Sequence, residues 1–231
     1  MFRIDAGTSI YRKRIIVLAI IGVLAAAWYT YRPSTIEESP TTIEIPDRKP
    51  PAFKLSTTEI AAFKRRTKQR LRSFEAEFKR ASSGGVFDWR LLAAISYQES
   101  QWNPAAKSTT GVQGLMMLTR VTAETVGVSD RRDPKQSIHG GAKHLDWIFD
   151  NLPDDVSRQT ARSFALAAYN VGLSRVKMAW WKSGVAEWGD FVKYIGLESG
   201  SPCIEIQRSN CSALRAAIKY SRRVEAFREL L

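Results

Sequence analysis

The sequence has few of the residues that carry metal or thiol chemistry. It contains two cysteines and two histidines among 231 residues, whereas a structural zinc site needs four nitrogen or sulfur ligands. Cys203, Cys211, His139 and His144 show none of the paired spacings typical of such a site. The P-loop, dinucleotide-binding, zinc-protease and nucleophile-elbow motifs are also absent. We therefore expect no metal, no cofactor and no cysteine–histidine nucleophile.

Acidic residues are scarce relative to basic ones. The 23 Asp and Glu are outnumbered by 35 Lys and Arg, which gives a formal net charge of +12. Such a surplus favours anionic partners, namely nucleic acid, an acidic membrane surface or a carboxylate-rich polymer. Hydrophobic residues make up 44% of the chain, which is enough for a folded core.

Residues 1–31 predict a membrane segment. Arg12, Lys13 and Arg14 precede an uncharged run, Ile15–Tyr31, of 17 residues, the short end of what spans a bilayer. The basic cluster would stay cytoplasmic and send the rest of the chain across the membrane. A cleaved signal peptide ending near Ala25–Ala27 is the alternative. Both place the remainder in the cell envelope, anchored in the inner membrane or released into the periplasm, where we expect no nucleic acid partner.

Residues 32–84 connect this segment to the globular part. Residues 32–56 hold five of the nine prolines, as expected of an extended tether. Ser56 and Glu59 form a capping box, and residues 57–84 predict one amphipathic helix whose polar face is basic. That face either contacts an anionic lipid or polymer or is simply solvated.

Residues 85–231 predict an all-α domain. Asp88 is placed to cap a helix over Trp89–Ser100. Helical periodicity continues in later segments, and strand-like alternation occurs only at Cys203–Ile206. The expected helices cover residues 114–126, 137–149, 156–169, 174–181 and 213–231.

Glu99 stands out on the first of these helices. Leu92, Ile95 and Glu99 fall on one face, and the two apolar residues should point inward. Desolvation would raise the pKa of the Glu99 carboxyl and keep it protonated, as a general acid requires. A glutamate that swings outward near the helix end is the alternative, and position alone leaves both open.

The motifs around Glu99 occur in a familiar order. Glu99-Ser100 is followed by Gly114-Leu115-Met116-Met117-Leu118-Thr119 and then by Ala167-Ala168-Tyr169-Asn170. In these motifs the chain resembles the lytic murein transglycosylases with a soluble-lytic-transglycosylase (SLT), goose-lysozyme-like domain, and most of all the membrane-bound F type. The resemblance covers residues 86–181 and a segment from Tyr220 to Phe227. The helix pattern Ile138–Leu145 also fits, with His144 where that type usually shows Tyr. The chain departs from the F type in two ways. A tether and one basic helix stand in place of its solute-binding-like domain, and Glu229-Leu230 stands where family members usually have a Tyr-Val pair.

The resemblance implies a lysozyme-like fold and a role for each matched residue. Glu99 would be the single catalytic acid/base, and Ser100 would orient the acid or the sugar. Tyr169 would press on the reacting sugar or hold Glu99, and Asn170 would hydrogen-bond the glycan. The residues that line the glycan groove would be Gln113, Gly114, Leu115, Met116 and Met117. Structural roles remain open for most of them: core packing for Leu115, Met117 and Tyr169, and helix termination for Ser100 and Asn170.

The implied reaction cleaves the MurNAc-β-1,4-GlcNAc bond of peptidoglycan and closes a 1,6-anhydro ring. A hydrolase would need a second carboxylate, and none lies within the matched motifs. Glu124, Asp130, Asp133 and Asp146 are not placed by the sequence, so a lysozyme-type hydrolase is the alternative. The second alternative is a non-catalytic peptidoglycan-binding component of an envelope assembly. The partners expected are glycan strands and the membrane, and the sequence identifies no protein partner.

Cys203 and Cys211 are the only thiols. Export would place them in an oxidising compartment, where two nearby cysteines pair. A loop this short would contribute about 2–3 kcal/mol by chain entropy. We therefore expect a disulfide between them, with two buried thiols as the alternative.

Overall fold

The computed structural model describes residues 53–153, 156–197 and 208–231. Within these residues the secondary structure consists of helices and two isolated β-bridges, without an extended strand. The all-α prediction is confirmed for this part of the chain. The helices are α2 (Thr57–Gln69), η1 (Leu71–Ser73), α3 (Glu75–Ser82), α4 (Trp89–Ser100), α5 (Arg120–Val126), α6 (Pro134–Asp150), α7 (Arg158–Val171), α8 (Leu173–Ser183), α9 (Trp188–Tyr194) and α10 (Arg208–Arg228).

Several expectations fall outside the described residues. These are the membrane segment 1–31, most of the tether and the strand candidate Cys203–Ile206. Among the helices that are described, none has both the length and the apolar character that a bilayer span requires. Cys211 is buried and disulfide-bonded. Its pairing with Cys203 stays a prediction, because Cys203 is not among the described residues.

The helix starts follow the capping chemistry that the sequence predicts. The Asp88 carboxylate accepts from the backbone N–H of Leu91 at 3.0 Å, and α4 begins at Trp89. At α2 the backbone N–H of Glu59 donates to the Ser56 hydroxyl, and the Glu59 carboxylate accepts from the backbone N–H of Ser56. This is the predicted capping box, which satisfies two backbone donors at the helix end.

The single basic helix predicted over residues 57–84 is instead two helices joined by one 3-10 turn. Arg70, with φ −125°, leaves the helical conformation at the junction. In one straight helix Phe63 and Phe78 would lie about 22 Å apart along the axis. The bend brings both into the same core, where each is at most 1% exposed. The helix is therefore interrupted at Arg70, because the bend lets Phe63 and Phe78 be buried together.

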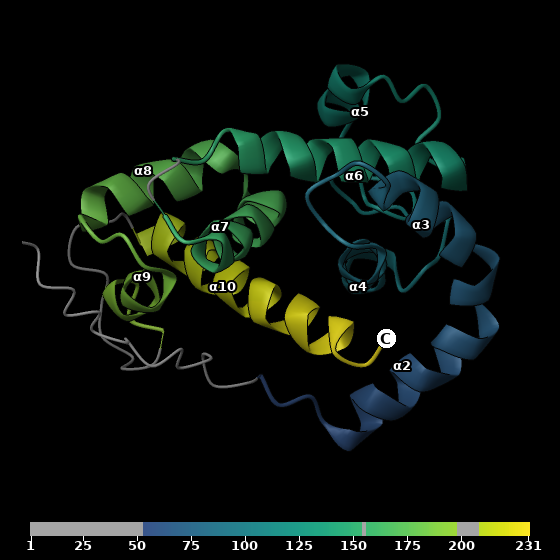
Figure 1. The fold of residues 1–231 in the computed structure, drawn as a ribbon, viewed down its shortest axis with the longest axis horizontal. Coiled ribbons are helices and arrows are strands. Elements are labelled where there is room, and N and C mark those ends of the chain that lie inside the picture. The colour runs from purple at the N-terminus through teal and green to yellow at the C-terminus, as the bar shows by residue number, and fades with distance from the viewer. Residues whose placement is uncertain (1–52, 154–155, 198–207) are drawn as a thin grey trace, which may run out of the picture. The chain divides into compact units, whose positions relative to one another are not determined.

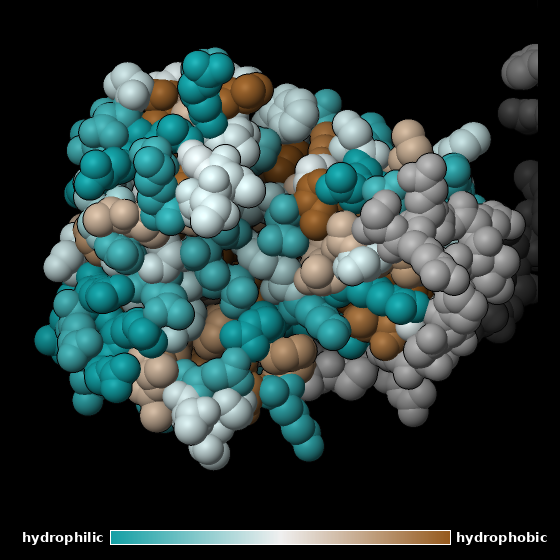
Figure 2. Space-filling view, turned by 180° about the vertical axis from the view of Figure 1, so that it is seen from behind, coloured by the Kyte–Doolittle hydropathy of each residue, from teal (hydrophilic) through white to brown (hydrophobic). Residues whose placement is uncertain are grey.

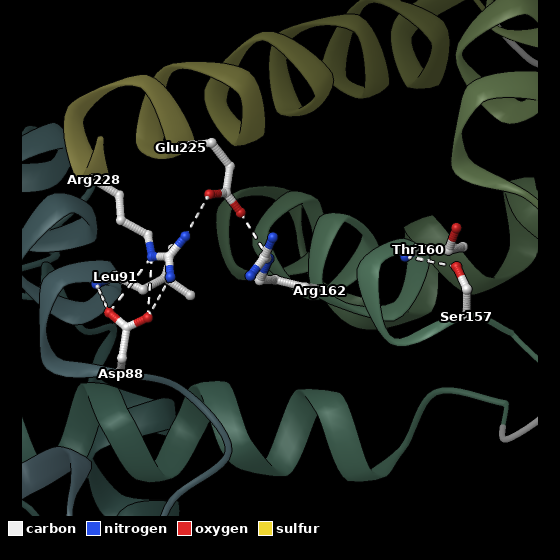
Figure 3. A network of polar contacts seen from close by, with 7 residues as sticks. All are labelled: Asp88, Leu91, Ser157, Thr160, Arg162, Glu225 and Arg228. Atoms are coloured by element: carbon white, nitrogen blue, oxygen red, sulfur yellow. Dashed lines mark hydrogen bonds and ion pairs between the residues drawn. The ribbon is translucent and has the colours of Figure 1, made fainter. Parts of the chain in front are cut away.

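The last helix organises the core. α10 packs against both α7 and α4, and its C-terminal end lies beside α2 (Figure 1). Arg228 of α10 is paired with the α4 cap Asp88 at 2.5 Å, and Glu225 is paired with Arg162 of α7 at 2.8 Å (Figure 3). The same end of α10 is thus tied to the start of α4 and to α7.

An aromatic cluster fills the space between α2, α4 and α10. Phe63 lies 4.6 Å from Tyr97 and 5.1 Å from Phe227, measured between ring centroids, and Trp102 closes the group. Aromatic pairs at these separations stabilise a core beyond the area that they bury. The outer surface differs in character: on the face shown in Figure 2, hydrophilic side chains cover much of the surface and hydrophobic ones form separate small areas.

Candidate active site

Glu99 lies in the last turn of α4, on the inward face that the sequence predicts. Leu92 and Ile95 on the same stripe are 1% and 0% exposed. The helix ends in two consecutive residues of left-handed conformation, Gln101 and Trp102. Trp102 is fully buried, and its indole Nε1 donates to the carbonyl of Ala93 at 2.9 Å. This anchor fixes the end of α4 and with it the position of the Glu99 side chain.

The hydrogen-bond partner of Glu99 comes from the far end of the chain. The hydroxyl of Tyr220, on α10, donates to Glu99 Oε1 at 2.6 Å. The Tyr220 side chain is itself buried. Tyr220 is not among the site residues predicted from the sequence. The available signal was its place in the C-terminal segment that matches the family.

Burial sets the acidity of the Glu99 carboxyl. Desolvation raises its pKa from 4.5 to about 7, and the hydrogen bond from Tyr220 acts in the opposite direction by favouring the ionised form. Near neutral pH both the protonated and the ionised form of the carboxyl are therefore populated. A single group in that state can give a proton at one step and accept one at the next.

The segment that follows α4 forms a tight hairpin beside Glu99 in place of the helix predicted from residue 114. Backbone hydrogen bonds join Gln113 and Leu118 in both directions, at 3.1 and 3.2 Å. Gly114 has φ +85°, and a Cβ there would lie 1.7 Å from the carbonyl oxygen of Arg131. Met117 also has a positive φ, +47°. The helix begins only at Arg120, because these conformations are incompatible with helical backbone.

Two serine hydroxyls of α4 form hydrogen bonds with this hairpin. The hydroxyl of Ser100 donates to the carbonyl of Leu115 at 2.8 Å, and that of Ser96 reaches the same oxygen at 3.1 Å. Leu115 and Met116 are fully buried, so their side chains belong to the core. Met117 is half-buried. The structure thus gives Ser100 a positioning contact with the hairpin, and its predicted contact with the acid or the sugar stays a prediction.

Tyr169 connects the hairpin to α7. Its hydroxyl donates to the carbonyl of Met116 at 2.9 Å. Burial raises the pKa of Tyr169 well above its usual value, and the negative charge of Glu99 raises it further. The side chains of Tyr169 and Glu99 therefore lie close together. Asn170, the next residue, is exposed. Glu99, Tyr220, Tyr169 and the 113–118 hairpin therefore form one constellation from four separate parts of the chain.

The carboxylates that the sequence left unplaced are engaged elsewhere. Glu124 lies on the surface of α5, 3.8 Å from Arg120. Asp133 caps α6. Asp130 accepts from the backbone N–H of Arg132, and Asp146 accepts from that of Val86. Among the described residues, no second carboxylate contributes to the pKa shift of Glu99.

Comparisons with known proteins show which proteins the chain is similar to. Residues 77–187 match the family model of the transglycosylase SLT domain. The chain is 40% identical over 181 residues to membrane-bound lytic murein transglycosylase F of Maricaulis maris, covering 75% of this chain and 39% of that protein. It is 54% identical over 110 residues to the protein of the same name from Pseudomonas fluorescens, covering 48% and 23%. The chain thus spans less than half the length of these relatives.

A solved structure to which this chain is similar is the soluble lytic transglycosylase SLT70 of Escherichia coli. The sequence identity is 24%, the TM-score is 0.46, and the match covers 67% of this chain and 23% of that one. The resemblance inferred from the sequence motifs is confirmed by the family match and by the relatives. Residues 77–187 are therefore similar to the transglycosylase SLT domain.

Proposed function

We propose that this protein is a peptidoglycan lytic transglycosylase that cleaves the MurNAc-β-1,4-GlcNAc bond and leaves a 1,6-anhydroMurNAc end. Glu99 serves as its only acid/base. The observation that carries the proposal is the state of Glu99: a partly buried carboxyl with a pKa of about 7, hydrogen-bonded to Tyr220. The relatives named lytic murein transglycosylase supply the substrate class.

In the first step Glu99 acts as a general acid. Protonated Glu99 donates to the glycosidic oxygen while the bond breaks through an oxocarbenium-like state. The hydroxyl of Tyr220 then stabilises the carboxylate that remains, because a hydrogen bond to the ionised form favours it. The hydrogen bond thus becomes stronger as negative charge develops, which is what catalysis requires of a stabilising group.

The second step returns the proton to Glu99. The carboxylate takes it from the C6 hydroxyl of the same sugar, whose oxygen attacks the anomeric carbon and closes the ring. An intramolecular nucleophile gains from proximity what a water molecule would need a second carboxylate to supply. This choice over hydrolysis is supported by the position of Glu124, Asp130, Asp133 and Asp146, all of which have other contacts.

We also propose that the protein acts in the cell envelope, with residues 1–31 as its membrane anchor. The relatives are named as membrane-bound, and the sequence of residues 12–31 has the charge step and apolar run of an inner-membrane segment. The catalytic domain then faces the periplasm and reaches glycan strands.

Digestion of purified sacculi tests the reaction. We expect muropeptides that are about 18 mass units lighter than hydrolysed ones, because ring closure incorporates no water. The Glu99→Gln variant, which keeps the shape of the side chain but cannot transfer a proton, should release none. Hydrolysed reducing ends would support the lysozyme-type alternative instead, and an inactive wild-type protein would support a binding role.

A further inference from the structure

Beside the constellation around Glu99, three aromatic side chains form a continuous series that ends at the surface. The ring of His144, on α6, lies 5.5 Å from that of Tyr169. On its other side, the ring of Trp147 lies 6.0 Å away and nearly parallel, at 10°. His144 is partly buried, whereas Trp147 is 49% exposed. The series therefore runs from a residue next to Glu99 to an indole that faces solvent.

Trp147 is held in place on its helix. The ring of His144 lies beside that of Trp147 in a nearly parallel, offset arrangement. The side-chain amide of Asn151 donates to the carbonyl of Trp147 at 2.8 Å, which keeps the last turn of α6 closed. Burial lowers the pKa of His144, so the ring beside the indole is uncharged near neutral pH. The result is a flat, supported aromatic surface whose outer part has no cover among the described residues.

The surroundings of Trp147 are polar. Lys143 is exposed and lies four residues before Trp147, on the same face of α6. A flat aromatic side chain next to a hydrogen-bond donor suits a pyranose ring, which offers an apolar C–H face and polar hydroxyl and acetamido groups at its edge. The ammonium group of Lys143 would form ion pairs with the carboxylates of a peptidoglycan strand.

We propose that Trp147, supported by His144, is a saccharide-stacking subsite that holds the glycan strand beyond the sugars bound at Glu99. The proposal rests on the proposed function for the identity of the glycan. It assigns a binding role to two residues outside the motifs around Glu99. Its consequence is a preference for long glycans, because the additional sugars of a longer strand would contact Trp147 beyond those held at Glu99.

Another exposed tryptophan provides a matched control. Trp181, on α8, is 82% exposed and borders an apolar groove of about 800 Å³. In the part of the chain that the structure describes, no ring contact joins Trp181 to Tyr169. Removal of Trp181 therefore deletes a larger exposed indole surface without touching the series that leads to Glu99.

The test measures binding separately from catalysis. In the full-length Glu99→Gln background, a disaccharide and a hexasaccharide of β-1,4-linked N-acetylglucosamine are titrated by calorimetry. We expect Trp147→Ala to weaken binding of the hexasaccharide about tenfold and to leave the disaccharide unchanged. Trp147→Phe should restore most of the affinity, and Trp181→Ala should leave both affinities unchanged.

Three results would overturn the subsite: an unchanged affinity of Trp147→Ala for the hexasaccharide, an equal loss for both oligosaccharides, or no advantage of the longer one in the parent. The reaction is judged separately, by the products that the wild-type protein releases from sacculi. Length-dependent binding through Trp147 without anhydro products would overturn the proposed function and keep the subsite.

Discussion

The burial of Glu99 predicts a stability that depends on pH and that one substitution removes. Desolvation raises the pKa of this carboxyl from 4.5 to about 7 in the folded protein. Below pH 4.5 the carboxyl is protonated in both the folded and the unfolded chain, so it has no effect. As the pH rises from 4.5 to about 7, the unfolded chain releases the proton first, and stability is lost.

The size of the effect follows from the difference in pKa. A shift from 4.5 to about 7 corresponds to about 3 kcal/mol. Glu99→Gln replaces the carboxyl by a neutral group of the same shape, whose side-chain oxygen can still accept from Tyr220. We therefore expect the variant to gain about 3 kcal/mol relative to the wild type between about pH 4 and about pH 8.

Urea unfolding of both proteins at these two pH values measures the effect. Glu124→Gln is the matched control, because Glu124 is a solvent-exposed glutamate, 66% accessible, in a helical ion pair. Its substitution should change the free energy of unfolding by less than about 0.5 kcal/mol at either pH. If the difference between Glu99→Gln and the wild type were the same at both pH values, the carboxyl would have an ordinary pKa and the assignment of its role would fail.

Three further outcomes are expected. Gly114→Ala should lower the free energy of urea unfolding by more than about 3 kcal/mol, because its Cβ would meet the carbonyl of Arg131. Gly111→Ala, at the same φ of +85° but in open space, should lower it by about 1 kcal/mol, and equal losses would contradict the account. Tyr220→Phe removes a hydrogen bond that lowers the pKa of Glu99, so the pH at which product formation declines should rise, and a fall or no shift would argue against the pairing. Thiol labelling of the denatured, unreduced protein should find no free cysteine; two labelled thiols would exclude the Cys203–Cys211 disulfide.

Local chemistry allowed the sequence to predict one half of the site. Asp88 caps α4 as expected, and the spacing of Leu92, Ile95 and Glu99 placed the carboxyl on the buried face. These features depend on residues a few positions apart, and helical geometry relates them directly.

The other half depends on contacts that no local pattern encodes. Tyr220 reaches Glu99 across 121 positions of sequence, which only the packing of α10 on α4 brings about. The segment from Gly114 to Leu118 has helical periodicity, yet it folds as a hairpin because Ser96 and Ser100 bind its backbone. α9 was not predicted either, since it is seven residues long and is held by the burial of Trp188 and Phe191 in the shared core.

The most direct test of the central claim is the origin of the oxygen atoms at the newly formed chain end. Sacculi are digested by the wild-type protein in water enriched in a heavy oxygen isotope, and the masses of the released muropeptides are measured by mass spectrometry. If Glu99 acts alone and the sugar's own C6 hydroxyl closes the ring, the products should be anhydro forms without heavy oxygen. Reducing ends that carry heavy oxygen would show that water is the nucleophile and would contradict the account.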